Sequence, residues 1–189
     1  MVQVFSEAAA AFAAGDYRES IRLADQAKHI ALRSAAAREL LGIALYRAER
    51  YADAARELLA FRRISGSTEQ NPVIADCYRA AGKPERALEL IAELTSGDTP
   101  APVLFEGRIV AAGALADMDR LDDAISTLEN LPLRPGVAQE HHLRSWYALA
   151  DLLERKGRFT QAREWFEAVV STNAELTDAP ERLRRLPAK

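Results

Sequence analysis

The sequence predicts an all-α protein, an α-solenoid of about five stacked helix hairpins followed by a C-terminal capping helix. Three observations support this fold. The chain is rich in alanine, leucine, glutamate and arginine, which favour helices, and only 7% of it is aromatic, which argues against a thick core. A short pattern recurs with a period near 34 residues. Around each recurrence, apolar residues are spaced three and four positions apart, as on one face of a helix.

The recurring pattern is a turn, then an apolar or ring residue, and then a small residue three positions later. The small residues are Ser20, Ala54, Ala87, Ala124 and Ala162. Their spacings are 34, 33, 37 and 38 residues. A second set of small residues precedes four of the turns, at Gly42, Ala75, Ala112 and Ala150. Bulky side chains in either set would push paired helices apart, so both sets are expected in the seams of the hairpins.

Ten repeat helices follow from these turns and from the apolar spacing. In the second pair, the first helix carries Leu41 and Leu45 on one face, and the second carries Tyr51 and Leu58. The turns inside the five pairs are at residues 15–16, 49–50, 82–83, 118–120 and 157–158. The expected helices are residues 2–14, 17–30, 34–48, 51–64, 70–81, 84–95, 102–118, 121–130, 138–156 and 159–172. One hairpin cannot bury its apolar stripe alone, so neighbouring hairpins are expected to stack.

Consecutive pairs divide a single domain of residues 1–189 into five repeats and a cap. The repeats are expected at about 1–34, 35–67, 68–104, 105–142 and 143–176. Two connectors, 95–102 and 131–137, contain proline and glycine and explain the longer spacings. Thr177 and Asp178 are expected to cap a final helix within 177–187, with Pro180 in its first turn. The arginines of this helix would form the polar lid that the end of a solenoid requires.

The fifth repeat resembles the consensus of the tetratricopeptide repeat family. Its matching residues are Trp146, Ala150, Leu153, Gly157, Phe159, Ala162 and Phe166. The second repeat is similar, through Leu41, Gly42, Leu45, Tyr51 and Ala54. The other repeats depart from the consensus at Ser20, Pro84 and Met118-Asp119. The resemblance covers essentially the whole chain and implies a right-handed superhelix that binds other proteins.

Several segments also look like those of a family of actinobacterial tetratricopeptide proteins with no established activity. They are residues 62–66, 72–77, 84–90, 108–113 and 177–183. This resemblance supports the architecture and implies no particular function. Members of that family usually carry a charged, proline-rich leader, whereas this chain begins directly in a predicted helix. A shorter member or a trimmed chain is therefore expected.

Composition and charge argue against several classes of protein. The formal net charge of −3 and the alternation of charge signs lack the basic face that nucleic-acid binding needs. Cys77 is the single cysteine, so an internal disulfide is excluded. The N-terminal residues lack the basic and long apolar regions of a secretory signal, and the stretch 8–14 is far too short to span a membrane. We therefore expect a cytoplasmic protein without nucleic-acid or membrane partners.

Few residues in the sequence are suited to catalysis or metal binding. His141 and His142 are adjacent, so they face different directions on a helix and are expected to be surface residues of its first turn. Cys77 is expected to be a buried thiol and not a nucleophile. The nine glycines form no phosphate-binding loop. No catalytic residue, cofactor or metal is predicted, and the protein is not expected to be an enzyme.

By resemblance, the first helix of each repeat lines a concave groove that contacts ligands. The matching positions define the predicted peptide-binding groove: Glu39, Ile43, Tyr46, Arg47, Asp76, Arg79, Glu106, Ile109, Asp117, Arg144, Tyr147, Asp151, Glu154 and Arg155. Both charge signs occur in it, which suits a helix or extended peptide that carries both. The alternative is that these charges only solvate the helix faces. Phe5 and Ala9 stand where the family's clamp for a C-terminal carboxylate would begin, so that clamp is not expected.

Phe5 and Phe12 lie seven positions apart on the first helix. If exposed, they would mark a homodimer contact or a docking site for a leader. If the first hairpin folds them inward, they belong to the core, which the tight turn at Gly15 favours. The predicted function is thus a non-catalytic scaffold or adaptor that binds a protein or peptide of unspecified identity. A self-association module and a regulatory subunit of a larger complex remain the alternatives.

Overall fold

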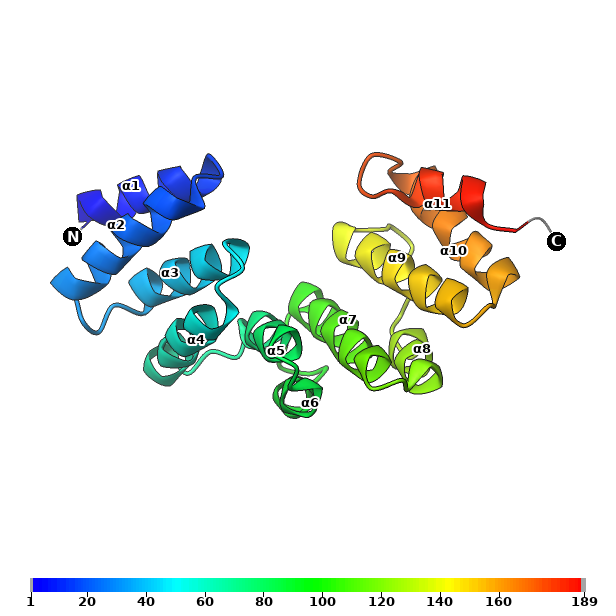
Figure 1. Cartoon of the computed structure of the whole chain (residues 1–189), viewed down its shortest axis with the longest axis horizontal. Helices are drawn as coiled ribbons and strands as arrows, with labels where there is room; N and C mark the ends of the chain where they lie inside the picture. The colour runs from blue at the N-terminus through cyan, green and yellow to red at the C-terminus, as the bar shows by residue number, and fades with distance from the viewer. Residues whose placement is uncertain (1, 188–189) are drawn as a thin grey trace. The chain divides into compact units, whose positions relative to one another are not determined.

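The computed structural model describes residues 2–187, and in that range its regular secondary structure consists of eleven helices and no strand (Figure 1). The predicted all-α fold is confirmed. The chain divides into two compact units, Met1–Leu94 and Thr95–Lys189. The sequence-based assignment of one domain to residues 1–189 stays a prediction.

The first unit consists of three helix hairpins. Its helices are α1 (Val2–Ala13), α2 (Tyr17–Ile30), α3 (Ala35–Arg47), α4 (Tyr51–Ser65), α5 (Asn71–Ala80) and α6 (Pro84–Ala92). Each helix packs on the next one in sequence, and α3 also packs on both α1 and α5. The first helices of the three hairpins therefore lie side by side in one layer (Figure 1).

The second unit consists of two hairpins and a short final helix. Its helices are α7 (Ala101–Asp117), α8 (Leu121–Glu129), α9 (Glu140–Arg155), α10 (Phe159–Thr172) and α11 (Ala179–Arg185). Within this unit α7 packs on α8 and α9, α9 packs on α8 and α10, and α11 packs on α10. The stacking order is the same as in the first unit, with first helices α7 and α9 as neighbours.

Every predicted helix is present, with its ends shifted by a few residues. For example, α6 ends at Ala92 where the sequence predicts 95, and α11 is shorter at both ends than the expected 177–187. Asp178 precedes α11 without capping it through its side chain. Thr177 supports the start instead, because its Oγ1 accepts a hydrogen bond of 3.2 Å from the Ala179 N–H.

Both sets of small residues form the helix seams, as predicted. The residues that follow the turns are completely buried: Ser20, Ala54, Ala87, Ala124 and Ala162. In the partner helices Ala75, Ala112 and Ala150 are buried to the same degree, and Gly42 of α3 faces Leu58 of α4. The small side chains let the helix axes approach closely, and their regular spacing repeats the same packing along each unit.

Each of the five hairpins turns through one residue in the left-handed conformation. These residues are Gly15, Glu49, Gly82, Asp119 and Gly157. Glycine adopts this conformation without a steric cost, whereas a side chain meets its own backbone there. The second and fourth hairpins thus keep the turn geometry of the others with less suitable residues.

Candidate functional site

In the first unit, predicted groove residues from α3 and α5 meet at the Asp76 carboxylate. The Tyr46 hydroxyl donates a hydrogen bond of 2.6 Å to Asp76 Oδ2, and Arg79 Nε donates one of 2.8 Å to Oδ1. The Tyr46 ring packs against the buried core and edge-on to Tyr51, with 5.9 Å between ring centroids. Asp76 therefore joins the first helices of the second and third hairpins.

The other predicted residues of the first unit do not join this cluster. Glu39 Oε1 accepts a hydrogen bond of 2.8 Å from Gln70 Nε2, which lies just before α5. Ile43 is half-buried on α3, and Arg47 is exposed at the C-terminal end of that helix. On the first-helix face of this unit, Tyr46 and Glu39 therefore already form hydrogen bonds to the neighbouring hairpin.

In the second unit, the first helices α7 and α9 are joined by an ion pair beside an open pocket. Arg144 of α9 donates a hydrogen bond of 2.9 Å from a terminal guanidinium nitrogen to Glu106 Oε1 of α7. Half of the Arg144 side chain and about a third of that of Glu106 are exposed, at 50% and 35%. The pocket has a volume of about 400 Å³ and is lined by Pro102, Glu106, Gln139, Glu140, His141 and Arg144.

Further along α9, three more predicted groove residues bind an arginine of the final helix. Arg182 of α11 donates from Nε and a terminal nitrogen to Glu154 Oε2, at 3.0 and 2.6 Å. The same terminal nitrogen donates to Asp151 Oδ1 at 2.8 Å, and the other donates to the Tyr147 hydroxyl oxygen at 3.3 Å. The sequence predicted that α11 is a polar lid, but not that it lies on these groove positions.

Aromatic rings complete the surroundings of Arg182. Its guanidinium lies 5.2 Å from the ring centroid of Phe166, and the Tyr147 ring meets Phe166 edge-on at 5.6 Å. Although burial opposes its charge, the hydrogen bonds to Asp151 and Glu154 raise the pKa of Arg182 above its ordinary value. Burial, and then a hydrogen bond from its hydroxyl to Asp178, raise the pKa of Tyr147.

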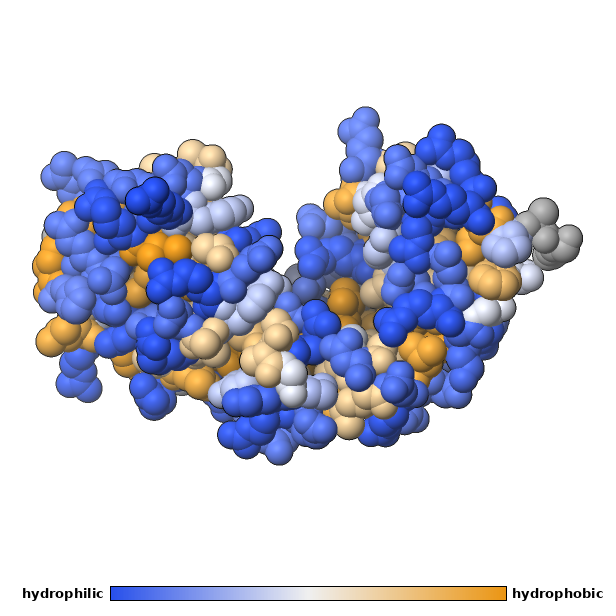
Figure 2. Space-filling view, viewed as in Figure 1, coloured by the Kyte–Doolittle hydropathy of each residue, from blue (hydrophilic) through white to orange (hydrophobic). Residues whose placement is uncertain are grey.

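The remaining predicted residues of the second unit lie on α7 and α9. Ile109 is half-buried on α7, Asp117 is exposed at the end of α7, and Arg155 is exposed at the end of α9. Hydrophilic side chains cover much of the face of each unit that Figure 2 shows. Within each unit, hydrogen bonds or ion pairs thus join some of the predicted groove residues to neighbouring helices.

A profile of the tetratricopeptide repeat family matches residues 5–67 and 109–180, well over half of the chain. The chain belongs to the tetratricopeptide repeat family. The unmatched stretch between these segments contains the third repeat, in which Pro84 replaces the aromatic residue of the consensus. No curated protein matches the sequence. Tetratricopeptide repeat proteins generally mediate protein–protein interactions.

Solved tetratricopeptide repeat structures share this fold at low sequence identity. A thermophilic member from Thermus thermophilus has a TM-score of 0.74 and 16% identity, covering 96% of both chains. PilF from Pseudomonas aeruginosa has a TM-score of 0.71 and 18% identity, covering 97% of this chain and 82% of its own. YrrB, a tetratricopeptide repeat protein with an unusual peptide-binding site, has a TM-score of 0.57 and 17% identity, covering 96% and 90%. These likenesses establish the fold alone.

The two neighbouring histidines at the start of α9 do not both lie on the surface, so that prediction was wrong for His142. Only 8% of His142 is exposed, and its Nδ1 accepts a hydrogen bond of 3.1 Å from the Gln139 backbone N–H at the start of α9. His141 is half-buried against Phe105, with 4.6 Å between ring centroids. Burial, together with His142, lowers the pKa of His141. His142 thus helps to begin α9.

Cys77 of the third repeat is a buried thiol, as predicted. Burial, and then the neighbouring Asp76 carboxylate, raise its pKa to about 12. The group therefore stays protonated near neutral pH and is a poor nucleophile. Within residues 2–187, no three His, Cys, Asp or Glu side chains are grouped as a metal site would require. In the same range, no helix is both long and apolar enough to cross a membrane.

Phe5 and Phe12 of the first repeat are both half-buried. The Phe12 ring packs against Tyr17 at the start of α2, with 5.5 Å between centroids. Phe12 therefore contributes to the first hairpin, as the core interpretation expects.

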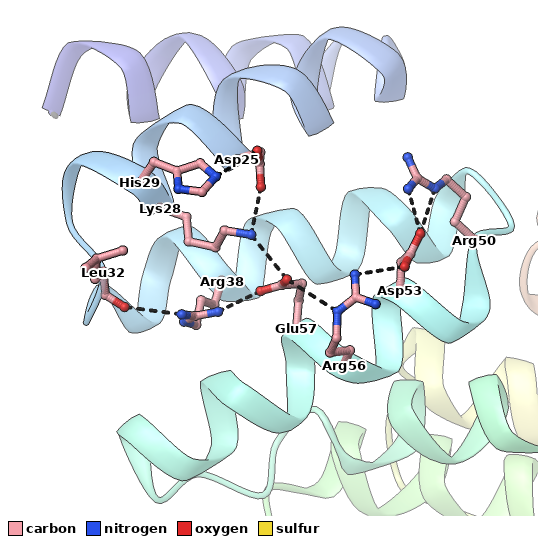
Figure 3. Close-up of polar contacts among 9 residues, drawn as sticks. All are labelled: Asp25, Lys28, His29, Leu32, Arg38, Arg50, Asp53, Arg56 and Glu57. Carbon is pink, nitrogen blue, oxygen red and sulfur yellow. Dashed lines mark hydrogen bonds and ion pairs between the residues drawn. The ribbon is translucent and has the colours of Figure 1, made fainter.

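A charged cluster formed by α2, α3 and α4 of the first unit was missed by the sequence analysis (Figure 3). Glu57 of α4 is only 6% exposed, and its carboxylate accepts hydrogen bonds from Lys28 of α2 at 3.2 Å and Arg38 of α3 at 2.8 Å. Lys28 also pairs with Asp25 at 2.7 Å. Glu57 thus joins three helices of two repeats. Its place after Arg56 resembles an ordinary solvated charge pair, so the sequence carries no clear signal of its burial.

Proposed function

We propose that this protein is a non-catalytic interaction scaffold that binds a protein or peptide segment on its first-helix faces. The observation that carries the proposal is the Glu106–Arg144 pair beside the open pocket of about 400 Å³ between α7 and α9. A ligand can reach both charges and can replace their mutual contact with contacts of its own. A cytoplasmic location is part of the same proposal.

The chemistry of this face favours a segment that carries both charge signs. A carboxylate of the ligand would pair with Arg144, and a cation would pair with Glu106. Exposed ion pairs contribute little to stability, so separating this one costs the protein little. The peptide-binding site described for YrrB supports a peptide as the ligand class. No comparable observation favours self-association, because Phe12 packs within its own hairpin.

Affinity capture from the native host tests this function. The full chain is compared with the double variant Arg47→Glu and Arg144→Glu, which reverses two exposed charges of the first-helix faces. Arg86→Glu is the matched control, because Arg86 forms an exposed ion pair with Glu89 on the second helix α6. We expect proteins that the parent and the control retain and that the double variant loses, with unchanged helical circular dichroism. Equal capture by all three proteins would remove the proposal.

A further inference from the structure

We propose that α11 is an internal ligand that covers an arginine-binding site on α9, and that the partner presents an arginine from a helix to this same site. The inference rests on the proposed function, since it names the ligand chemistry of the second unit's first-helix face. Three of the predicted groove residues, Tyr147, Asp151 and Glu154, already bind an arginine, namely Arg182. The occupant in the structure therefore shows what the site accepts.

The contacts fit a guanidinium better than any other cation. Arg182 uses all three of its nitrogens: Nε and one terminal nitrogen both donate to Glu154 Oε2, and the other terminal nitrogen donates to Tyr147. Hydrogen bonds between a guanidinium and a carboxylate are assisted by charge and are among the strong ones. The Phe166 ring lies 5.2 Å from the guanidinium carbon, where a planar cation is attracted to an aromatic face. A lysine ammonium is a single point charge and cannot make these contacts together.

Helix α11 is short and buries few side chains of its own. It has only seven residues, far fewer than an isolated helix needs, and its N-cap side chain makes no capping hydrogen bond. Its buried anchors are the small Ala179 and, just after the helix, Leu186. Arg163 of α10 adds hydrogen bonds of 3.3 Å to the carbonyl oxygens of Leu186 and Pro187. Arg182 is therefore the principal side-chain contact between α11 and α9.

Because α11 is part of the same chain, a partner must bind α9 strongly enough to displace it. A short tether gives α11 an effective concentration on the order of millimolar, so a ligand that offers one arginine alone will not displace it. A partner must add contacts elsewhere on α9. Arg144 and the pocket beside it lie on the same helix as Tyr147 and Asp151, three and seven positions earlier. A helix long enough to reach both places would compete successfully, and α11 would exclude weaker ligands.

Hydrogen exchange and peptide binding on the full chain test this inference. In the first experiment, we expect Arg182→Ala to speed exchange of the backbone amides of α11 at least tenfold while leaving α9 and α10 protected. Arg184→Ala is the matched control, because Arg184 is exposed and pairs with Glu181 of its own helix, at 4.0 Å. Unchanged exchange of α11 in Arg182→Ala would overturn the proposal.

In the second experiment, a fluorescent synthetic peptide with the sequence of residues 176–187 is titrated into each full-length protein. We expect it to saturate Arg182→Ala at concentrations at least tenfold lower than the parent, where α11 covers the site. The increase in affinity for the peptide should be smaller in Arg182→Lys, which keeps the charge. It should be absent in the double variant Arg182→Ala with Glu154→Gln. Equal binding by the parent and Arg182→Ala, or a gain that survives Glu154→Gln, would contradict the proposal.

The two proposals fail separately. Capture of host proteins that depends on Arg47 and Arg144, without any change in α11 exchange or peptide binding, would leave the scaffold function and remove the arginine site. Peptide binding that depends on Glu154, without captured proteins, would leave the arginine site and remove the scaffold function.

Discussion

The backbone of Gly42 in α3 lies directly against the Leu58 side chain of α4. A Cβ atom built on Gly42 would lie 2.5 Å from Leu58 Cγ and 2.6 Å from Cδ2, well inside contact distance. Leu58 is completely buried, so it cannot swing away into solvent. This contact sets the closest approach of the two helices in the second repeat, and it explains why glycine occupies a helix interior that otherwise favours alanine.

Replacing Gly42 by alanine is expected to destabilise the protein by about 1 to 3 kcal/mol, the usual cost of overpacking. The helix propensity of alanine, worth about 1 kcal/mol, offsets only part of this. Urea unfolding followed by circular dichroism measures the change. In a Leu58→Ala background the clash is removed, so Gly42→Ala should there be neutral or stabilising. An equal loss in both backgrounds would show that the Leu58 contact is not the cause.

Replacing Ser20 by alanine is expected to stabilise the protein. Its side chain is completely buried at the α1–α2 seam, and its Oγ has no hydrogen-bond partner within the described residues. A buried hydroxyl without a partner costs about 1 to 3 kcal/mol, and alanine also fits the seam, as it does at Ala54. Ser20→Ala should therefore raise the unfolding temperature by several degrees. A lower unfolding temperature would mean that the hydroxyl is satisfied in solution.

A glycine in place of Glu49 should also stabilise the turn of the second hairpin. Glu49 has φ of 58°, in the left-handed region where a side chain costs roughly 1 kcal/mol relative to glycine. Glu49→Gly should stabilise the second hairpin by up to about 1 kcal/mol, less the entropy that glycine adds to the unfolded chain. Asp119 is the internal comparison, with φ of 60°, because aspartate tolerates this region better. A larger gain at Asp119 than at Glu49, in thermal unfolding, would contradict this explanation.

The repeat architecture could be predicted because it depends on residue size at fixed spacing. The small residues of the seams mark the hairpins one by one, and the seam geometry follows from their volume. The side-chain contacts could not be predicted in the same way. Arg182 reaches Glu154 across 28 positions in sequence, and nothing local distinguishes it from Arg184 or Arg185. His142 was missed for a related reason, since it packs against the Phe105 ring of α7, which is far from it in the sequence.

The Glu57 cluster should contribute measurably to the stability of the first unit. Glu57→Gln keeps the shape of the side chain but removes the charge that Lys28 and Arg38 share (Figure 3). Loss of the Glu57 charge removes the carboxylate that pairs with Arg38 and leaves Lys28 with Asp25 alone. We therefore expect a cost of about 2 to 4 kcal/mol in urea unfolding. Glu89→Gln, which breaks an exposed pair on α6, should change stability by less than about 0.5 kcal/mol. Similar values for the two variants would mean that Glu57 is solvated in solution.

The contribution of Lys28 should depend on pH in a defined direction. Burial would lower its pKa, but the hydrogen bonds to Asp25 and Glu57 outweigh this and raise it above the ordinary 10.5. A raised pKa means that the folded state binds the proton more tightly than the unfolded state. The stability from this charge is therefore complete below pH 10.5 and declines as the pH rises toward the folded-state pKa. Lys28→Met should be less stable than the parent at neutral pH, and urea unfolding should show that this difference shrinks above pH 10.5. A difference that stays constant through this range would mean that Lys28 acts through its alkyl chain and not through its charge.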